Sequence, residues 1–259
     1  MNKPVLKYYE MSPCVTAFSS TRKGGCSIGN YGEFNVNRYC GDDESCIRAN
    51  REALCAELGI DDEHLIMPHQ NHGIEIRQIT PDFFKLPSTI RCQILENVDG
   101  VITDMNGVCV GVSTADCIPI LLFDKEHHAC AAVHAGWRGT VKRIIQYAIA
   151  VMQATYNTRP ESLQACIGPG ISLEAFEVGD EVWQQFSDAG FDMNTISRRY
   201  EKWHIDLWEC NRRQLTDVGV NPHDIQIADI CTYSRADEFF SARKLTVNSG
   251  RILTGILIK

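Results

Sequence analysis

Three residues that could hold a metal ion stand where the sequence changes from an apolar run to a turn. His72 lies in the polar segment HQNHG, which has the composition of a loop. Cys117 follows Asp116 in a sharp turn between two apolar runs, and His134 ends an apolar run and opens the segment HAGWRG. Loops at the ends of strands often carry functional residues on a rigid scaffold. These three side chains are therefore candidates for a reaction centre.

Two imidazoles and one thiolate make a good zinc site. Three protein ligands leave a fourth position open for water or substrate, and an ion there can act as a Lewis acid or activate water. Residue type alone leaves ordinary alternatives open, because a histidine at a strand end is often structural and a cysteine between apolar strands often belongs to the core. His69 beside His72 can be coincidental, and His127 with His128 is expected at an exposed hairpin tip.

Four arginines are candidates for binding an anion. Arg22 precedes a Gly-Gly pair, whose backbone N–H groups can form an anion-binding nest. Arg138 is expected at the N-terminus of a helix, where the backbone also favours anions. Arg51 lies inside the helix that follows GDD, and Arg243 follows the apolar FFSA. Taken singly, each arginine is also compatible with an ordinary structural or surface ion pair.

The predicted strands that must position these residues alternate with helices. A strand is expected around residues 15–18, and three apolar runs follow in the middle of the chain, at 107–112, 118–123 and 129–133. Their short connections predict antiparallel pairs. Further strands are expected in ACIGPGI, IQIADI and RILTGILI. The pattern predicts a single domain, residues 1–259, folded as a three-layer α/β/α sandwich with a mixed β-sheet.

Capping signals predict where the helices begin and end. Asp42 or Asp43 can cap a helix that ends at Gly59, and Asp206 with Glu209 is a capping-box pattern for a helix that ends near Gly219. GDEVWQQF begins another helix. After HAGWRG, apolar residues recur on one helical face: Val141, Ile144, Ile145, Ala148, Val151 and Met152. HAGWRG therefore lies between a strand and a helix, where open α/β sheets bind ligands.

Composition narrows the class of protein. The formal net charge of −8 argues against a nucleic-acid-binding surface. The sequence has neither an apolar run long enough to span a membrane nor a signal peptide, so we expect a cytoplasmic protein that does not bind membranes. Its 12 cysteines include no C-x-x-C pair and should be reduced, most of them packing residues. The usual signatures of dinucleotide, P-loop, zincin and serine-hydrolase sites are absent.

The order of several motifs along almost the whole chain resembles the YfiH/YlmD family, also called laccase-domain or DUF152 proteins. TADC-x-P followed by HAGWRG is the most specific part of the match. The other matching motifs are STRKGG, GDD, QNHG, DGVITD, CIGPGI and the terminal FFSARK, GR and GILI. The resemblance implies an α/β/α fold and one zinc ion held by His72, Cys117 and His134.

The resemblance also implies an activity. Members of this family are regarded as purine nucleoside phosphorylases for inosine, guanosine, adenosine and methylthioadenosine, with adenosine deaminase activity. Phosphorolysis needs phosphate held against the anomeric carbon, and deamination needs an activated water near purine C6. By the same resemblance, Asn35 and Arg51 are expected to contact substrate or phosphate, and Asp116 to orient a metal ligand. The expected partners are small molecules, namely purine nucleosides and phosphate.

Departures from the family pattern leave the substrate open. The usual L-N-L-G-L-H-V-G-D-D run appears here as F-N-V-N-R-Y-C-G-D-D, so Asn37 replaces a glycine and Tyr39 a histidine. An older family label suggests a copper-dependent polyphenol oxidase, and copper could occupy the same three ligands. A laccase cluster would need many more imidazoles, and only 8 histidines are present, none in an H-x-H pair. A non-catalytic partner-binding protein is a further alternative.

Overall fold

The computed structural model describes residues 3–259 and contains two large β-sheets. The six-stranded sheet has the order β13-β9-β7-β8-β5-β4. Its β13–β9 and β4–β5 pairs are parallel, and the other pairs are antiparallel, so the sheet is mixed. Its strands are β4 (Ile76–Gln78), β5 (Gly100–Thr103), β7 (Ile118–Asp124), β8 (Ala129–Ala135), β9 (Leu163–Ile167) and β13 (Ile225–Ile227).

The five-stranded sheet has the order β1-β2-β14-β6-β3 and is also mixed. Only its edge pair β3–β6 is parallel. Its strands are β1 (Leu6–Tyr9), β2 (Val15–Ser20), β3 (Leu65–Ile66), β6 (Cys109–Thr114) and β14 (Ile252–Ile258). The C-terminal strand β14 lies between β2 and β6, so the two ends of the chain are joined in one sheet.

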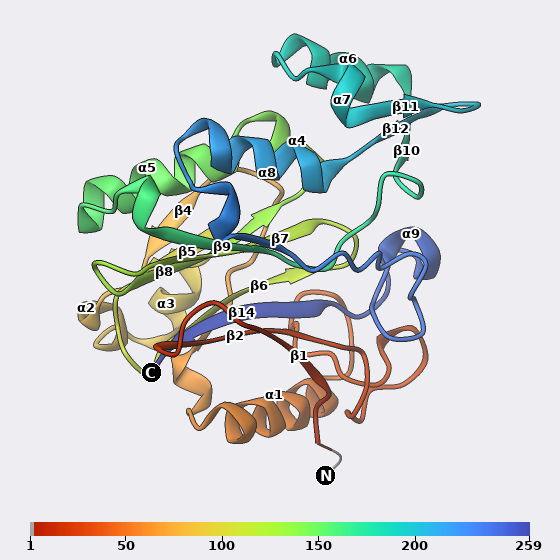
Figure 1. The fold of residues 1–259 in the computed structure, drawn as a ribbon. Coiled ribbons are helices and arrows are strands. Elements are labelled where there is room, and N and C mark those ends of the chain that lie inside the picture. The colour runs from red at the N-terminus through yellow and green to blue at the C-terminus, as the bar shows by residue number, and fades with distance from the viewer. Residues whose placement is uncertain (1–2) are drawn as a thin grey trace.

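The two large sheets stack face to face between layers of helices (Figure 1). Apolar side chains from both sheets, such as Val112 and Leu121, share one buried cluster between them. Helix α5 (Ile144–Tyr156) and helix α8 (Leu207–Asp217) cover the outer face of the six-stranded sheet. Helix α1 (Glu44–Leu58) covers the outer face of the five-stranded sheet. The predicted α/β class with mixed sheets is confirmed, and the β layer of the sandwich is double.

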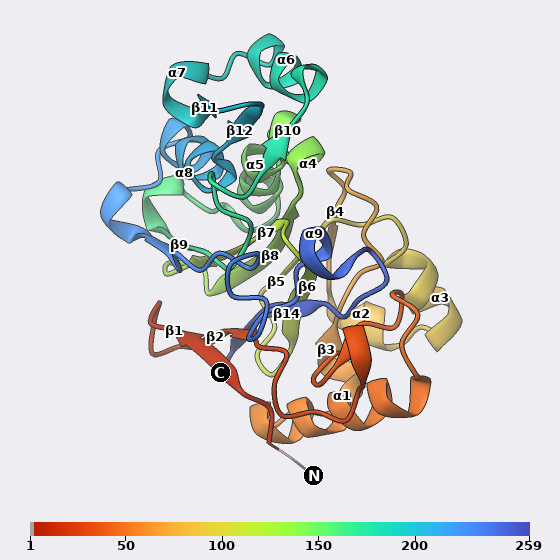
Figure 2. The same ribbon diagram turned by 90° about the vertical axis from the view of Figure 1, so that its right-hand side faces the viewer.

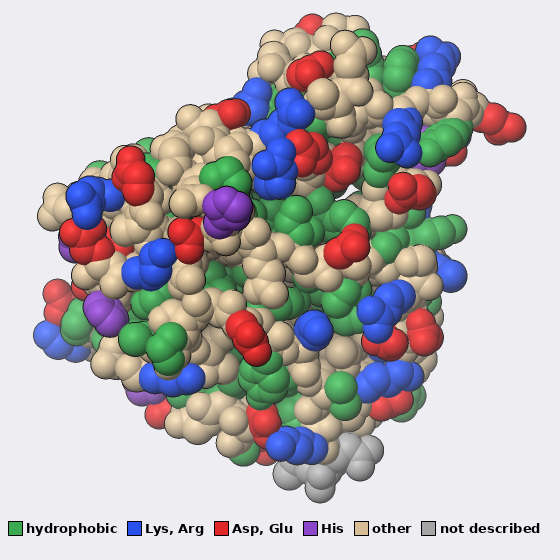
Figure 3. Space-filling view, viewed as in Figure 1, with side chains coloured by type: hydrophobic (Ala, Val, Ile, Leu, Met, Phe, Trp, Pro, Cys, Tyr) green, Lys and Arg blue, Asp and Glu red, His purple; other side chains and the backbone are tan. Residues whose placement is uncertain are grey.

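A smaller unit projects from one end of the stacked sheets in both ribbon views (Figures 1 and 2). Its antiparallel sheet has the order β10-β12-β11, with β10 (Glu177–Val178), β11 (Ser197–Arg199) and β12 (Trp203–Ile205). Helices α6 (Asp180–Asp188) and α7 (Met193–Ile196) complete it. Basic and acidic side chains are interspersed over the face of the molecule shown in Figure 3.

The capping signals placed several helix ends correctly. Asp43 accepts hydrogen bonds from the N–H groups at the start of α1, and Gly59 ends that helix with a positive φ of 70°. Asp206 accepts from the Glu209 N–H at the start of α8. The helix expected after HAGWRG is divided into α4 (Trp137–Val141) and α5, because Arg143 adopts a left-handed conformation. The short helices α2 (Pro81–Phe84), α3 (Ser88–Ile94) and α9 (Ala242–Leu245) complete the set in the described residues.

One predicted strand pairing is wrong. Strands β7 and β8 form the expected antiparallel pair, but β6 pairs with β14 and β3 in the other sheet. The turn between β6 and β7 carries the chain from one sheet to the other. Asp116 in this turn has a φ of 87°, a conformation that asparagine and aspartate tolerate better than most residues. The turn expected to make a hairpin is therefore a crossover between the two layers.

Within residues 3–259, no helix has both the length and the apolar character needed to cross a bilayer.

Candidate metal centre and its pocket

The fold brings the three predicted ligands together. The ligand atoms of His72, Cys117 and His134 all lie within 4.8 Å of one another. His72 lies on the crossover from β3 to β4, and Cys117 lies on the crossover from β6 to β7. His134 faces Pro119 across the β7–β8 pair, so the register places it beside the start of β7. The cluster thus lies where two separate crossovers meet the end of β8.

A buried carboxylate, Asp99, supports two of the ligands. Its Oδ1 is 2.7 Å from His134 Nδ1 and accepts a hydrogen bond of 3.0 Å from the His72 backbone N–H. Its Oδ2 accepts a hydrogen bond of 2.7 Å from the Gly73 N–H. Engagement of His134 Nδ1 leaves Nε2 as the nitrogen available to a metal. Asp99 thereby fixes both the tautomer of one ligand and the loop that carries another.

The electrostatics of the centre suit a metal ligand set. Burial raises the pKa of the Cys117 thiol, but His134 and His72 beside it lower that pKa below its usual value. Burial also raises the pKa of Asp99, and the hydrogen bond and charge of His134, with the backbone N–H groups, lower it overall. The thiolate and the carboxylate are therefore the favoured forms. A thiolate is the form of cysteine that binds metals.

Gly136 leaves room for an ion between the ligands. A Cβ atom added at Gly136 would lie 2.9 Å from His72 Cδ2, 3.2 Å from Cys117 Sγ and 3.6 Å from His134 Cε1. The φ of −65° at Gly136 is accessible to any residue, so a backbone conformation is not the reason for glycine here. The space itself requires it. The donor set and this space fit a metal ion, so these three side chains could bind one.

The ligands open onto a cavity of about 240 Å³, which we call the metal-side pocket. The Ser113 and Thr114 hydroxyl oxygens are buried and have no hydrogen-bond partner among the described residues. Two aromatic rings, Tyr39 and His69, stack with centroids 4.0 Å apart. The remaining lining residues are Asn37, Cys40, Gln70, Ala115, Ala242, Val247 and Arg251. The pocket therefore offers a ring stack and one arginine beside the three candidate ligands.

Asp116 and Arg243 are linked to each other. Asp116 Oδ2 accepts a hydrogen bond of 2.7 Å from the Arg243 backbone N–H, and its Oδ1 accepts one of 2.7 Å from the Thr232 hydroxyl. Asp116 thus ties the turn before Cys117 to the turn that contains Thr232 and to helix α9. The exposed Arg243 guanidinium donates to the Glu177 carbonyl, so it belongs to the junction with the projecting unit.

Asn35 is completely buried beneath the pocket wall and does not line the pocket. Its Nδ2 donates to Asp42 Oδ2 over 2.9 Å, and its Oδ1 accepts from the Arg251 backbone N–H over 3.1 Å. Asn35 therefore connects the loop that contains Tyr39 to the pocket arginine.

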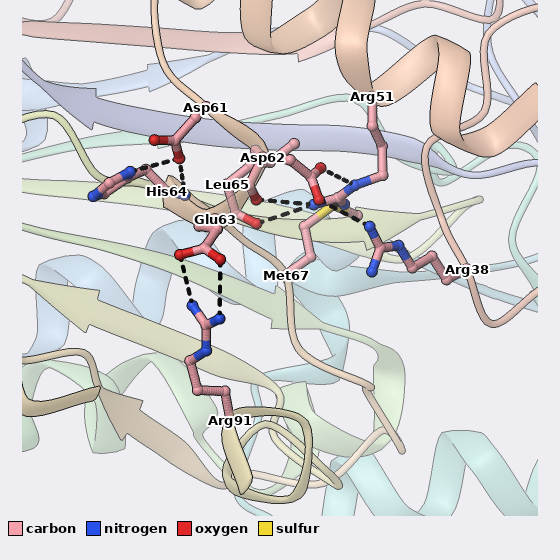
Figure 4. A network of polar contacts seen from close by, with 9 residues as sticks. All are labelled: Arg38, Arg51, Asp61, Asp62, Glu63, His64, Leu65, Met67 and Arg91. Atoms are coloured by element: carbon pink, nitrogen blue, oxygen red, sulfur yellow. Dashed lines mark hydrogen bonds and ion pairs between the residues drawn. The ribbon is translucent and has the colours of Figure 1, made fainter. Parts of the chain in front are cut away.

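Arg51 lines a second cavity of about 250 Å³, which we call the adjoining pocket. Tyr39 lines both pockets. The Arg51 guanidinium is buried, with Nε 2.5 Å from Asp62 Oδ1, and Arg38 pairs with the same carboxylate (Figure 4). Arg51 Nη1 has the Met67 sulfur, a weak acceptor, as its partner. The structure thus separates Arg51 from the metal ligands by the Tyr39 ring.

Arg22 and Arg138 line neither pocket. Arg22 donates from Nε to the Gly32 carbonyl and from Nη1 to the Ala236 carbonyl. Arg138 is exposed, with its guanidinium over the Trp137 ring.

Sequence reasoning missed Asp99, Ser113, Thr114 and Arg251. Asp99 directly precedes the buried strand β5, and Arg251 directly precedes β14. Both residues therefore adjoin the end of an apolar run, which is the signal that made His134 a candidate. Ser113 and Thr114 end an apolar strand and carry no signal of their own, because hydroxyl side chains are common at such places.

Comparisons with known proteins identify the family. Residues 16–259 match the family described as multi-copper polyphenol oxidoreductase laccase. A purine nucleoside phosphorylase of Bacteroides thetaiotaomicron is 45% identical, over 99% of this chain and 97% of its own. Adenosine deaminase RL5, from an unknown prokaryotic organism, is 39% identical, over 95% of this chain and 94% of its own. The crystal structure of YlmD from Geobacillus stearothermophilus superposes with a TM-score of 0.89 at 27% identity, covering 97% of this chain and 94% of that one. The chain therefore belongs to the multi-copper polyphenol oxidoreductase laccase family, and its resemblance to YfiH and YlmD proteins is confirmed.

Proposed function

We propose that this protein is a zinc-dependent purine nucleoside phosphorylase, acting on inosine, guanosine, adenosine and methylthioadenosine, with adenosine deaminase activity. The observation that carries the proposal is the position of one His-Cys-His cluster on the wall of a pocket of about 240 Å³, together with an exposed aromatic ring and an arginine. Two relatives named for these activities, at 45% and 39% identity, support the choice of reaction. One metal-binding pocket can serve both reactions, because both act on a purine nucleoside.

In this proposal His72, Cys117 and His134 hold the zinc ion. When bound, zinc supplies Lewis-acid chemistry, which draws charge from a departing base or activates water. Asp99 holds His134 in the tautomer that presents Nε2, and it keeps the His72 loop in place. Asp116 fixes the turn that carries Cys117. These two carboxylates therefore position the ligands without contacting the substrate.

The other side chains of the pocket suit the substrate. The exposed Tyr39 ring, backed by His69, offers a flat surface on which a base can stack. Arg251 is the arginine that lines the metal-side pocket, so we place the phosphate beside it.

The decisive experiment measures metal content and turnover on the same sample, purified without added metal. We expect about one zinc per chain and release of hypoxanthine from inosine that requires phosphate. Cys117→Ser should lose metal and activity, whereas Cys92→Ser, an exposed cysteine of the adjoining pocket, should keep both. Substantial copper, oxygen-dependent oxidation of a polyphenol and no phosphate-dependent release would favour the copper oxidase instead.

A second experiment tests where phosphate binds. Arg251→Lys should raise KM for phosphate, because a lysine cannot reproduce the guanidinium geometry at that position. Arg51→Lys in the adjoining pocket is the comparison. A larger effect of Arg51→Lys would move the phosphate site to the far side of Tyr39.

A further inference from the structure

Two cysteines outside the metal centre lie against each other on the surface. Cys26 is exposed and follows strand β2, and Cys46 is partly exposed in the first turn of α1. Cys26 Sγ is 3.5 Å from the Cys46 carbonyl oxygen, and Cys46 Sγ is 3.3 Å from the Cys26 carbonyl oxygen. Each side chain therefore crosses to the backbone of the other residue. The two thiols are also within hydrogen-bonding reach of each other, so their sulfur atoms are neighbours, as a disulfide requires.

The two cysteines mark the ends of a segment that forms part of the metal-side pocket. We call residues 27–45 the wall segment. Three of its residues, Asn37, Tyr39 and Cys40, line the pocket. Apart from the 3₁₀ turn Gly29–Tyr31 and the first two residues of α1, the wall segment is loop, and none of its residues belongs to a strand. A covalent bond between its ends would therefore restrict the backbone that carries the Tyr39 ring.

In the reduced protein, Asn50 holds the wall segment. This buried side chain of α1 accepts a hydrogen bond of 3.1 Å from the Cys26 N–H through Oδ1. Its Nδ2 lies 3.1 Å from Ser27 Oγ and donates to the Asn35 carbonyl over 3.0 Å. These bonds bring Cys26 to the helix turn that contains Cys46. The protein thus has a preformed contact that oxidation can make covalent.

We propose that Cys26 and Cys46 form a redox modification site. A low-molecular-weight disulfide oxidises the two thiols to a Cys26–Cys46 disulfide, which fixes the wall segment of the metal-side pocket. The Cys26 thiolate attacks one sulfur of the small disulfide, whose S–S bond breaks and releases one thiol. Cys46, after losing its proton to solvent, attacks the Cys26 sulfur and releases the second thiol. Two protein thiols thereby lose two electrons and two protons, and the small disulfide becomes two thiols.

The surroundings of the two cysteines determine which thiol attacks the oxidant first and which one then resolves the mixed disulfide. Cys26 is the more exposed thiol and can reach a soluble oxidant. The contact with the Cys26 thiol, together with burial and the nearby Asp43, raises the pKa of Cys46 to about 11. A thiol with a raised pKa is a poor first nucleophile at neutral pH, but it can attack a neighbouring mixed disulfide that lies in contact with it. Cys26 is thus the attacking residue and Cys46 the resolving one.

The test uses the metal-loaded protein and oxidised glutathione as the small disulfide. Peptides are analysed by mass spectrometry without reduction, with fragmentation to distinguish Cys46 from Cys40, because no Lys or Arg separates them. We expect a Cys26–Cys46 cross-link that dithiothreitol reverses. Amide hydrogen exchange in the wall segment should slow on oxidation. Tm should rise by about 5 °C, because a disulfide that closes a loop of this length restricts the unfolded chain.

Two variants make the result specific. Cys26→Ser should show neither the cross-link nor the slower exchange, while Cys92→Ser, which removes another exposed thiol, should behave as the unmodified protein. Separate glutathione adducts on Cys26 and Cys46, or a cross-link between other cysteines, would overturn the proposal. A Cys26–Cys46 bond without slower exchange in the wall segment would overturn its effect on the pocket.

Discussion

The rings of Tyr39 and His69 stack with their centroids 4.0 Å apart and their planes inclined by 13°. His69 Nδ1 is 2.6 Å from Glu96 Oε1, and this contact holds the His69 ring in place under the Tyr39 ring. Tyr39 forms part of the metal-side pocket and of the adjoining pocket. The Tyr39 ring therefore forms the partition between the metal-side pocket and the adjoining pocket of Arg51.

Replacement of Tyr39 tests the role of this partition in substrate binding. Tyr39→Ala removes the ring on which we place the base, and stacking of a base on an aromatic side chain contributes about 1–3 kcal/mol. We expect KM for inosine to rise roughly tenfold, with a smaller change in kcat. Tyr8→Ala removes a similarly exposed ring on β1 and is the control. Equal KM values for the two variants would show that the base binds elsewhere.

Asp99→Asn should weaken metal binding. The substitution removes the charge that fixes the His134 tautomer, and loss of such a partner typically lowers metal affinity about 10- to 100-fold. Competition with a chelator, read as metal content after dialysis, measures the change. Asp104→Asn removes the same charge at an exposed position just after β5 and should retain the metal. Retention of metal by both variants would contradict the role given to Asp99.

Gly136→Ala should exclude the ion while the fold remains intact. The added methyl group would lie 2.9 Å from His72 Cδ2 and 3.2 Å from Cys117 Sγ, so at least one ligand must move. We expect the variant to lose its metal, and to unfold in the presence of a chelator at nearly the same Tm as the unmodified protein. If the Gly136→Ala protein kept its metal, the three ligands would have to surround the ion without the space at residue 136, and the expectation would be wrong.

Asp124 should make stability depend on pH in the acid range. Burial raises the pKa of this carboxyl, but hydrogen bonds from His127, the Glu126 N–H and Ser162 outweigh it and lower the pKa to about 2. A lowered folded-state pKa contributes stability above the unfolded pKa of roughly 4, and this contribution is lost as pH falls toward 2.

Asp124→Asn is the matched test of that dependence. Allowing for solvent screening at the hairpin, we expect the variant to be less stable by about 1–2 kcal/mol at pH 7. Urea unfolding between pH 2 and 7 should show the difference shrinking below pH 4. A difference that is constant over this range would mean that the charge of Asp124 is not the cause.

The three residues of the candidate metal centre could be singled out from the sequence because each has a local signal. Cys117 and His134 stand where apolar runs end abruptly. Such a position lies at the end of a strand whichever sheet that strand joins. Residue pattern does not show whether a short turn closes a hairpin or leads to another layer, and for this reason the pairing of β6 was missed. Side-chain partners are also not local: Arg51 pairs with Asp62, 11 residues away, and so lies in the adjoining pocket.

The role of Asp99 could not be predicted from the sequence. Its partners His72 and His134 lie 27 and 35 residues away, on opposite sides in the sequence. Only the assembled sheets bring the carboxylate to both, so its role depends on tertiary structure. The same holds for the Ser113 and Thr114 hydroxyls, whose lack of partners is visible only when the neighbouring atoms are known.

Two of the crossovers between the sheets, β3 to β4 and β6 to β7, have a consequence for how the metal relates to folding. His72 and Cys117 each lie on a different passage from one sheet to the other, and His134 belongs to the six-stranded sheet alone. The three donors can therefore meet only after both sheets have been assembled and joined. Any metal ion retained at this seam links the two layers, so that its binding energy adds to the cohesion between them. A bound ion would mark a chain whose tertiary assembly is complete.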